Sequence, residues 1–135
     1  MTQHGGCYCG ELRYELTADP VLKGQCHCRE CQHIAGGAPQ YYMAIPQHGL
    51  RYTQGGPKAF RRTDLDDPVS REFCATCGTH ILTRRADFDG VILKVGTLDT
   101  PATFKAPSIA IFVKDAQAFH HIPEGLPQFD GLPNF

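Results

Sequence analysis

The sequence predicts a single, mainly β domain that binds metal through cysteine. Three observations lead to this prediction: strand patterns dominate the chain, only one short segment has a clear helical pattern, and seven cysteines stand in three tight groups. The length of 135 residues fits one domain of about 100–200 residues. Apolar residues make up 41% and charged residues 20%, which is ordinary for a globular protein and excludes a largely disordered chain.

In the first half of the chain, strand patterns are separated by turn residues. Leu12–Leu16 alternates apolar and charged residues, which predicts a half-buried strand after the first cysteine pair. The helical pattern runs from Cys28 to about Ala35, and Gly36-Gly37 is predicted to end that helix. Three further short strands are predicted, separated by Pro46 and the turn at residues 55–57: Tyr41–Ile45, Leu50–Thr53 and Ala59–Thr63.

The second half continues the strand pattern. Val69–Phe73 leads into Cys74-x-x-Cys77 and Thr79–Arg84 leads out of it, so this cysteine pair is predicted to cap a hairpin. Val91–Val95 and Ile109–Val113 are apolar enough to form buried strands. A second short helical turn is predicted within residues 115–121.

The chain ends in two Leu-Pro-x-Phe units, at residues 126–129 and 132–135. Two units are too few for a repeat architecture. We therefore expect an extended tail that lies over the protein's own apolar surface. The alternative is that the tail binds the surface of a partner protein.

The seven cysteines point to zinc. They form three groups: Cys7-x-Cys9, Cys26-x-Cys28-x-x-Cys31 and Cys74-x-x-Cys77. Because the count is odd, a fully paired disulfide framework is excluded. Zn²⁺ prefers soft thiolates in a tetrahedron, at Zn–S distances of about 2.3 Å, which places two sulfurs on one ion about 3.8 Å apart. Glycines beside two of these groups predict the necessary turns: Gly5, Gly6, Gly10 and Gly78.

Seven thiolates divide most naturally into four and three. The two pairs, at residues 7/9 and 74/77, would close a tetrahedral structural site, and the triplet would leave one position open, as catalytic zinc sites do. An alternative is that both sites are structural and that His27 or His33 completes the second. A redox role for Cys74-x-x-Cys77 is disfavoured, because a strand pattern rather than a helix follows it.

Charge and hydropathy exclude several functional classes. With 13 basic and 14 acidic residues, the chain lacks the basic surface expected of a protein that binds nucleic acid or anionic membranes. Its longest apolar stretches are too short to cross a bilayer. The N-terminus has no basic run followed by an apolar one, so we expect no secretory signal and a cytoplasmic protein with reduced thiols.

The motifs occur in a specific order: Gly6-Cys7-x-Cys9-Gly10, Cys26-His27-Cys28-x-x-Cys31, Phe73-Cys74-x-x-Cys77-Gly78-Thr79, Gly96-Thr97-Leu98-Asp99 and Ile111-Phe112-Val113-x-Asp115. In this order they resemble the glutathione-dependent formaldehyde-activating enzyme family, also called the centromere protein V/GFA domain. The resemblance extends from about Gly5 to the C-terminus. It implies a β-tent zinc fold of coiled antiparallel sheets in one domain spanning residues 1–135, with a core at about 4–122 and a tail at 123–135.

The resemblance also implies a function. The family reaction is that of a carbon–sulfur lyase, which joins glutathione reversibly to formaldehyde as S-hydroxymethylglutathione. It implies two zinc sites. The structural one is at Cys7, Cys9, Cys74 and Cys77, and the catalytic one, where occupancy by zinc can be partial, is at Cys26, Cys28 and Cys31. No organic cofactor is expected.

Because a fourth thiolate suits a three-cysteine zinc, our hypothesis is that the open site captures a small thiol and holds it near a small aldehyde. The alternative function is a non-catalytic, zinc-stabilised module that binds a protein partner. An open β fold leaves strand edges exposed, which makes a homodimer compatible with either function.

Three other positions are weaker candidates for the pocket. Arg29 follows Cys28 and could meet a substrate carboxylate, with simple solvation as the alternative. His27 could relay a proton or point into the core. Tyr41 and Tyr42 lie on opposite faces of a predicted strand, so at most one of them lines a pocket.

Overall fold

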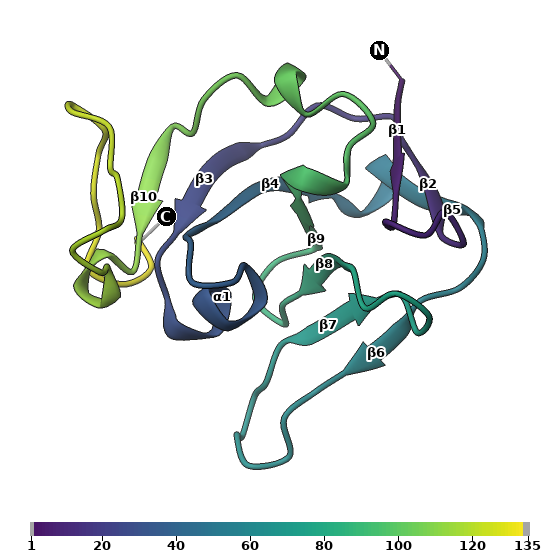
Figure 1. Cartoon of the computed structure of the whole chain (residues 1–135), viewed down its shortest axis with the longest axis horizontal. Coiled ribbons are helices and arrows are strands. Elements are labelled where there is room, and N and C mark those ends of the chain that lie inside the picture. The colour runs from purple at the N-terminus through teal and green to yellow at the C-terminus, as the bar shows by residue number, and fades with distance from the viewer. Residues whose placement is uncertain (1, 134–135) are drawn as a thin grey trace.

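A computed structural model describes residues 2–133 and contains two β-sheets (Figure 1). The smaller sheet has the order β1-β2-β5, with β1 at Gln3–Gly6, β2 at Arg13–Leu16 and β5 at Leu50–Gln54. The larger sheet has the order β10-β3-β4-β9-β8-β7-β6. Its strands are β3 (Leu22–Cys26), β4 (Gln40–Pro46), β6 (Lys58–Phe60), β7 (Ser70–Phe73), β8 (His80–Arg84), β9 (Gly90–Lys94) and β10 (Ile109–Ile111).

Helical structure is sparse, as predicted. The α-helix α1 covers Arg29–Ile34, and two glycines with positive φ angles, Gly36 and Gly37, follow it. Short 3₁₀ turns occur at Gln47–Gly49, Val95–Thr97, Pro101–Phe104 and Val113–Asp115. The mainly β prediction is confirmed. Within residues 2–133, no helix combines the length and the apolar character that a membrane crossing requires.

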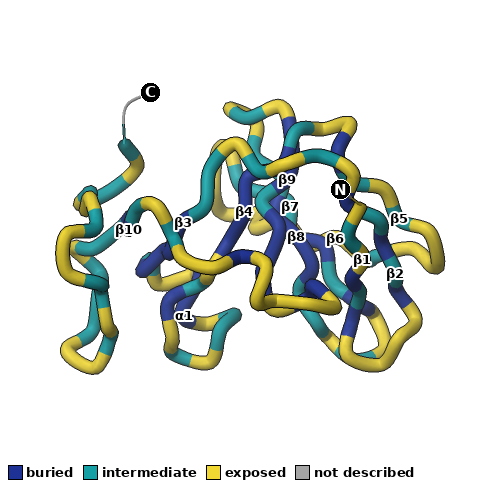
Figure 2. The backbone as a smooth tube through the Cα atoms, turned by 90° about the horizontal axis from the view of Figure 1, so that it is seen from above, coloured by how far each residue is buried: buried dark blue, intermediate teal, exposed yellow. Residues whose placement is uncertain are grey.

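The main core lies between the two sheets. Tyr14 and Leu16 of β2 are fully buried against Ile45 of β4, Leu82 of β8 and Leu93 of β9. Figure 2 shows this buried interior along the centre of the larger sheet. Since side chains alternate across a strand, the residues between these core positions project from the opposite face. That opposite face carries the candidate site.

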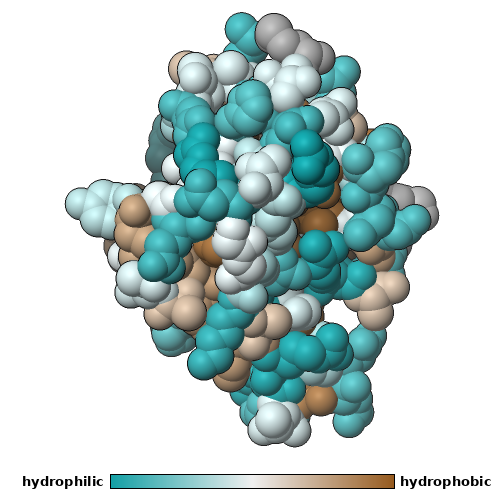
Figure 3. Space-filling model, turned by 90° about the vertical axis from the view of Figure 1, so that its right-hand side faces the viewer, coloured by the Kyte–Doolittle hydropathy of each residue, from teal (hydrophilic) through white to brown (hydrophobic). Residues whose placement is uncertain are grey.

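The smaller sheet forms a predominantly polar side of the molecule. In Figure 3, hydrophilic residues cover most of this side, and apolar residues lie in small separate groups. Tyr8, in the loop between β1 and β2, is almost fully exposed. The smaller sheet therefore packs its inner face on the core and presents charged and polar groups to water on its outer face.

Two strands were not predicted. Both β1 and β3 lack apolar alternation, since they read Gln-His-Gly-Gly and Leu-Lys-Gly-Gln-Cys. The expectation of turns at Gly5 and Gly6 was wrong, because both residues lie within β1. A Cβ at Gly5 would overlap the Tyr14 hydroxyl, so only glycine allows this close approach. The turns expected at Gly10 and Gly78 are present, with φ angles of +86° and +79°.

Other elements differ in extent or direction. The predicted hairpin of β7 and β8 is present, whereas β6 is shorter than the predicted Ala59–Thr63. The strand predicted over Ile109–Val113 ends at Ile111, because Phe112 adopts the left-handed region at φ +54°. In addition, β10 pairs with β3 in parallel, against the expectation of antiparallel sheets. A long segment rather than a tight turn separates these two strands, so no hairpin imposes an antiparallel direction.

The described part of the tail lies along β10. The N–H of Ala110 donates to the Pro127 carbonyl at 2.9 Å, and the N–H of Phe129 donates back to the Ala110 carbonyl at 3.0 Å. The Phe129 ring packs on a second apolar cluster that includes Cys26, Tyr42 and Ile111. The tail thus extends the sheet beside β10. The second Leu-Pro-x-Phe unit reaches residues 134 and 135, which lie outside the described residues.

We expect Phe129→Ala to lower the free energy of unfolding by about 2 kcal/mol, roughly half the loss for a fully buried phenylalanine, because this ring is half-buried. Chemical denaturation would measure the change. The control is Phe119→Ala, whose ring is 76% exposed and whose loss should stay within about 0.5 kcal/mol. Equal stabilities for the two variants would contradict the packing described for the tail.

Candidate metal centres

The first cysteine cluster connects the two sheets. Cys7 and Cys9 come from the loop between β1 and β2, and Cys74 and Cys77 come from the loop between β7 and β8. The four Sγ atoms all lie within 4.8 Å of one another. Sγ of Cys9 is 3.6 Å from that of Cys7 and 3.7 Å from that of Cys74. These separations match the spacing of about 3.8 Å between two sulfurs on one zinc ion.

Hydrogen bonds prepare this cluster for negative charge. The N–H of Leu12 donates to Cys7 Sγ at 3.2 Å, and the N–H of Cys77 donates to Cys74 Sγ at 3.5 Å. The hydroxyl of Thr79 lies 3.2 Å from Cys77 Sγ, and this contact lowers the pKa of Cys77 to about 5. Donors directed at sulfur favour the thiolate form that a metal requires.

The second cluster lies where β3 leads into α1. Cys26 is the last residue of β3, Cys28 is the N-cap of α1, and Cys31 is in the first turn of the helix. Their Sγ atoms all lie within 4.8 Å of one another. The N–H of Cys31 donates to Cys28 Sγ at 3.4 Å, so a sulfur fills the acceptor role that serine or aspartate usually has at an N-cap.

The three thiols share their protons unequally. Hydrogen bonds from Cys26 and Cys28 lower the pKa of Cys31 to about 3. The pKa of Cys26 is raised, first by its hydrogen bond to Cys28 and then by that to Cys31. The cluster therefore stabilises one thiolate at Cys31.

His27 does not complete this second cluster. Its ring is fully buried, and its Nε2 accepts a hydrogen bond from the Gln25 amide nitrogen at 2.9 Å. Its Nδ1 donates to His120 Nδ1 at 2.9 Å, and His120 Nε2 in turn donates to the Gly37 carbonyl at 2.7 Å. Both nitrogens of His27 are thus engaged away from the sulfurs, and burial lowers the pKa of the ring.

The other predicted histidine does not reach the cluster either. His33 is exposed, and its Nδ1 donates to the Arg29 carbonyl at 2.8 Å. Across residues 2–133, no histidine nitrogen or carboxylate oxygen joins the three sulfurs. Both clusters could hold metal ions, and their all-sulfur donor sets are consistent with zinc. The first would close a tetrahedron, whereas the second would leave one position for another ligand.

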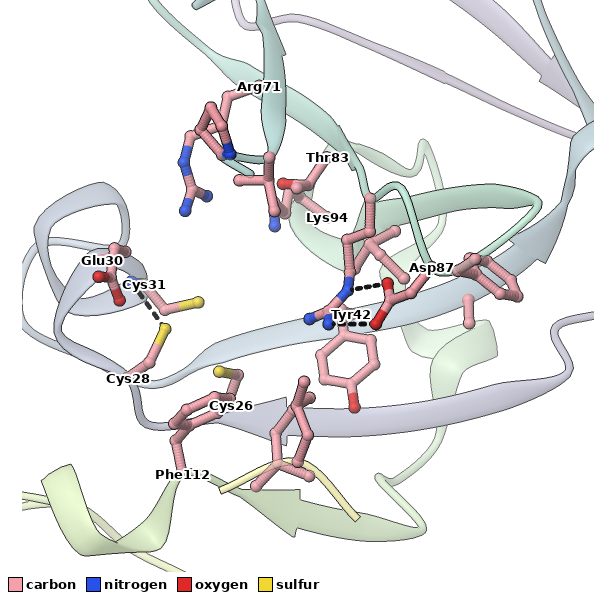
Figure 4. A pocket seen from close by; sticks show the side chains of 18 of the residues that line it. Cys26, Cys28, Glu30, Cys31, Tyr42, Arg71, Thr83, Asp87, Lys94 and Phe112 are labelled. Carbon is pink, nitrogen blue, oxygen red and sulfur yellow. Dashed lines mark hydrogen bonds and ion pairs between the residues drawn. The ribbon is translucent and has the colours of Figure 1, made fainter. Parts of the chain in front are cut away.

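The three-cysteine cluster forms part of the wall of a cavity of about 660 Å³ (Figure 4). The outer face of the larger sheet supplies an apolar floor, which includes Ala44, Ile92 and Ile111. Leu132 and Pro133 of the tail also line the cavity. The cavity thus combines sulfur ligands with an apolar surface, as small-molecule sites commonly do.

Of the two neighbouring tyrosines, Tyr42 lines the cavity and Tyr41 lies on the other side of the strand. Burial raises the pKa of Tyr42, so its hydroxyl stays protonated at neutral pH. Arg29 is exposed, and its guanidinium donates to the Gln32 side chain instead of lining the cavity. The expectation that Arg29 meets a substrate is therefore not supported by its position.

Among the basic residues that line the cavity, two that the sequence did not single out lie near the sulfurs. They are Arg71 on β7 and Lys94 on β9, and their side chains point into the space near the sulfurs (Figure 4). Burial lowers the pKa of Lys94, and the nearby Cys31 opposes that effect. The available signal was a charged residue inside the apolar run Val91–Val95, on the same strand face as Ile92.

The chain matches the sequence profile of a known protein family. The sequence profile described as "Glutathione-dependent formaldehyde-activating enzyme" matches residues 2–115, which include all seven cysteines. The chain belongs to the glutathione-dependent formaldehyde-activating enzyme family. The tail that borders the cavity lies beyond the residues matched to this family.

A solved structure is similar to this family member in fold. It is the crystal structure of a Rhodobacter sphaeroides protein, with a TM-score of 0.58 and 18% sequence identity, and the similarity covers 71% of this chain and 87% of that one. At this identity the likeness concerns the fold alone. No curated protein matches the chain.

Proposed function

We propose that the chain is a zinc-dependent carbon–sulfur lyase of the glutathione-dependent formaldehyde-activating type. The observation that carries this proposal is the position of Cys26, Cys28 and Cys31 in the wall of a cavity, with no fourth ligand atom from residues 2–133. Family membership supports the same conclusion. The substrates would be a small thiol such as glutathione and a small aldehyde such as formaldehyde.

The reaction requires little from the protein beyond activation and placement. Zinc held by the three cysteines would supply a Lewis acid that lowers the pKa of a thiol in its remaining position. In the forward direction one bond forms between the thiol sulfur and the carbonyl carbon, and the thiol proton ends on the former carbonyl oxygen. The reverse direction breaks that bond and returns the aldehyde and the thiol.

The cavity residues have defined parts in this scheme. The hydroxyl of Tyr42 stays protonated and can donate a hydrogen bond to the carbonyl oxygen, where negative charge develops. The apolar floor excludes water from the reacting atoms, which strengthens that hydrogen bond. The four-cysteine site lies elsewhere in the fold, between the two sheets. In this proposal its role is structural.

The proposal is tested by measuring zinc content and sulfur coordination before and after excess glutathione is added. We expect the sulfur count at the three-cysteine zinc to rise from three to four in X-ray absorption, with accelerated formation of the adduct from glutathione and formaldehyde in NMR. Two inert zinc ions, unaffected by thiols, together with a stable complex with another protein would instead support the binding-module alternative.

A further inference from the structure

Two cations in the cavity have no carboxylate partner among residues 2–133. Of the four basic residues that line it, Arg62 pairs with Asp64 and Arg85 pairs with Asp87. Neither Arg71 nor Lys94 forms an ion pair or a side-chain hydrogen bond with a described residue. The remaining acidic residues of the lining, at positions 30 and 67, are exposed.

A buried hydroxyl without a partner lies beside these two cations. Thr83 is 6% exposed, and its Oγ1 makes no hydrogen bond with the described residues. Lys94 is 5% exposed. A buried charge or hydroxyl without a partner is unfavourable, so a ligand that supplies acceptor oxygens would complete this group of side chains.

Strand pairing fixes these three side chains on one face. Arg71 is the register partner of Thr83, and Thr83 is the register partner of Ile92. Lys94 lies two residues beyond Ile92 on the same face of β9. Figure 4 shows the polar ends of Arg71, Thr83 and Lys94 gathered on one side of the cavity, with the three sulfurs facing them across the opening.

With its open position unfilled, a zinc ion held by the three thiolates would balance the charge of only one of the two cations. Three thiolates and one Zn²⁺ carry a single net negative charge, whereas Arg71 and Lys94 bring two positive charges. A thiolate in the open zinc position would bring one further negative charge, but a carboxylate would also bring the acceptor oxygens that Arg71, Lys94 and the Thr83 hydroxyl lack among the described residues. A guanidinium binds the two oxygens of a planar carboxylate side by side, and an ammonium and a hydroxyl can donate to the same group.

We propose that Arg71, Thr83 and Lys94 bind a carboxylate of the substrate, which makes the enzyme selective for acidic thiols or oxo acids. This inference rests on the proposed function, because the same cavity would hold the thiol and the aldehyde. The carboxylate can belong to the thiol or to the carbonyl compound. In either case it anchors the substrate across the cavity from the sulfurs.

The test uses the full chain loaded with zinc and two pairs of probes that differ in the carboxylate. The thiol pair is 3-mercaptopropionate and 3-mercaptopropanol, and the carbonyl pair is glyoxylate and glycolaldehyde. Calorimetry would give the affinity of each probe. We expect the acid of one pair to bind about tenfold more tightly than its neutral analogue, and the discriminating pair identifies the carboxylate's source.

Three variants remove the donors one at a time. Arg71→Gln and Lys94→Met should bring the affinity ratio of the discriminating pair to near one. Thr83→Val should reduce the ratio severalfold without lowering the melting temperature, because the hydroxyl has no partner among residues 2–133. If Lys94→Met fails to fold, the Thr83→Val variant still tests the inference. Arg62→Gln is the matched control, since its partner is Asp64, and it should retain the wild-type ratio.

Three outcomes would overturn the inference: ratios near one for both pairs in the wild type, unchanged ratios in the variants, or loss of zinc from Arg71→Gln and Lys94→Met. The third would mean that the two cations serve the metal site. S-Methylglutathione, which has carboxylates but no free thiol, separates this inference from the proposed function. If it binds the wild type more tightly than Arg71→Gln while glutathione leaves the zinc coordination unchanged, only the lyase proposal fails.

Discussion

Replacement of Cys74 by serine is expected to abolish cooperative folding. Its sulfur lies 3.7 Å from that of Cys9, so the four-cysteine site joins the β1–β2 loop to the β7–β8 loop and thereby the two sheets. Structural zinc contributes on the order of 10–16 kcal/mol to folding, whereas a whole domain is stable by about 5–15 kcal/mol. Loss of a zinc ion bound by these four sulfurs would therefore remove as much free energy as folding provides.

Circular dichroism during heating, together with zinc analysis, would measure this effect. Cys74→Ser and the chelated wild type should both lose the sharp thermal transition. Ala75→Ser is the matched control, because it places a hydroxyl on an exposed residue of the same loop and leaves all four sulfurs in place. A chelated protein that melts within a few degrees of the zinc-loaded one would show that the core between the sheets suffices.

Replacement of Cys28 by serine should have the opposite profile, with the fold retained and thiol binding lost. Serine is a favoured N-cap residue and can accept the hydrogen bond from the Cys31 N–H, so α1 keeps its first turn. The change therefore isolates the sulfur. Even loss of a group that only supports a metal ligand weakens metal sites by about 10–100-fold, so we expect glutathione affinity to fall at least a hundredfold.

Calorimetric titration with glutathione, with circular dichroism on the same samples, would check this expectation. His33→Gln is the control on the same helix, since its ring is exposed and bonds to the Arg29 carbonyl. It should bind glutathione as the wild type does. Wild-type thiol binding by Cys28→Ser would remove the three-cysteine site from the reaction, and loss of binding in His33→Gln would favour a site completed by histidine.

Segments with a strong local pattern were predictable. Leu12–Leu16 alternates, and β2 occupies Arg13–Leu16 with Tyr14 and Leu16 buried. The hairpin of β7 and β8 was expected from two predicted strands on either side of a cysteine pair, and it is present. In these cases one strand face or one turn gives the pattern, so neighbouring residues suffice.

Segments that are stabilised mainly by hydrogen bonds to distant strands were not predicted from the sequence. β3 contains a lysine, a glycine and a glutamine, yet it is held by β4 on one side and by β10 on the other. The left-handed Phe112 is likewise set by its surroundings, because the tail bonds to the backbone on both sides of it. Such hydrogen bonds join residues that are far apart in the sequence, so local propensity does not report them.

The amino-acid order by itself determined the two cysteine pairs and the triplet, because ligands two or three residues apart are brought together by local turns such as those at Gly10 and Gly78. Only the tertiary structure decided that His27 turns away from the sulfurs and that Arg71, Thr83 and Lys94 face them. Side-chain direction depends on strand register and sheet twist, which arise when distant segments pair.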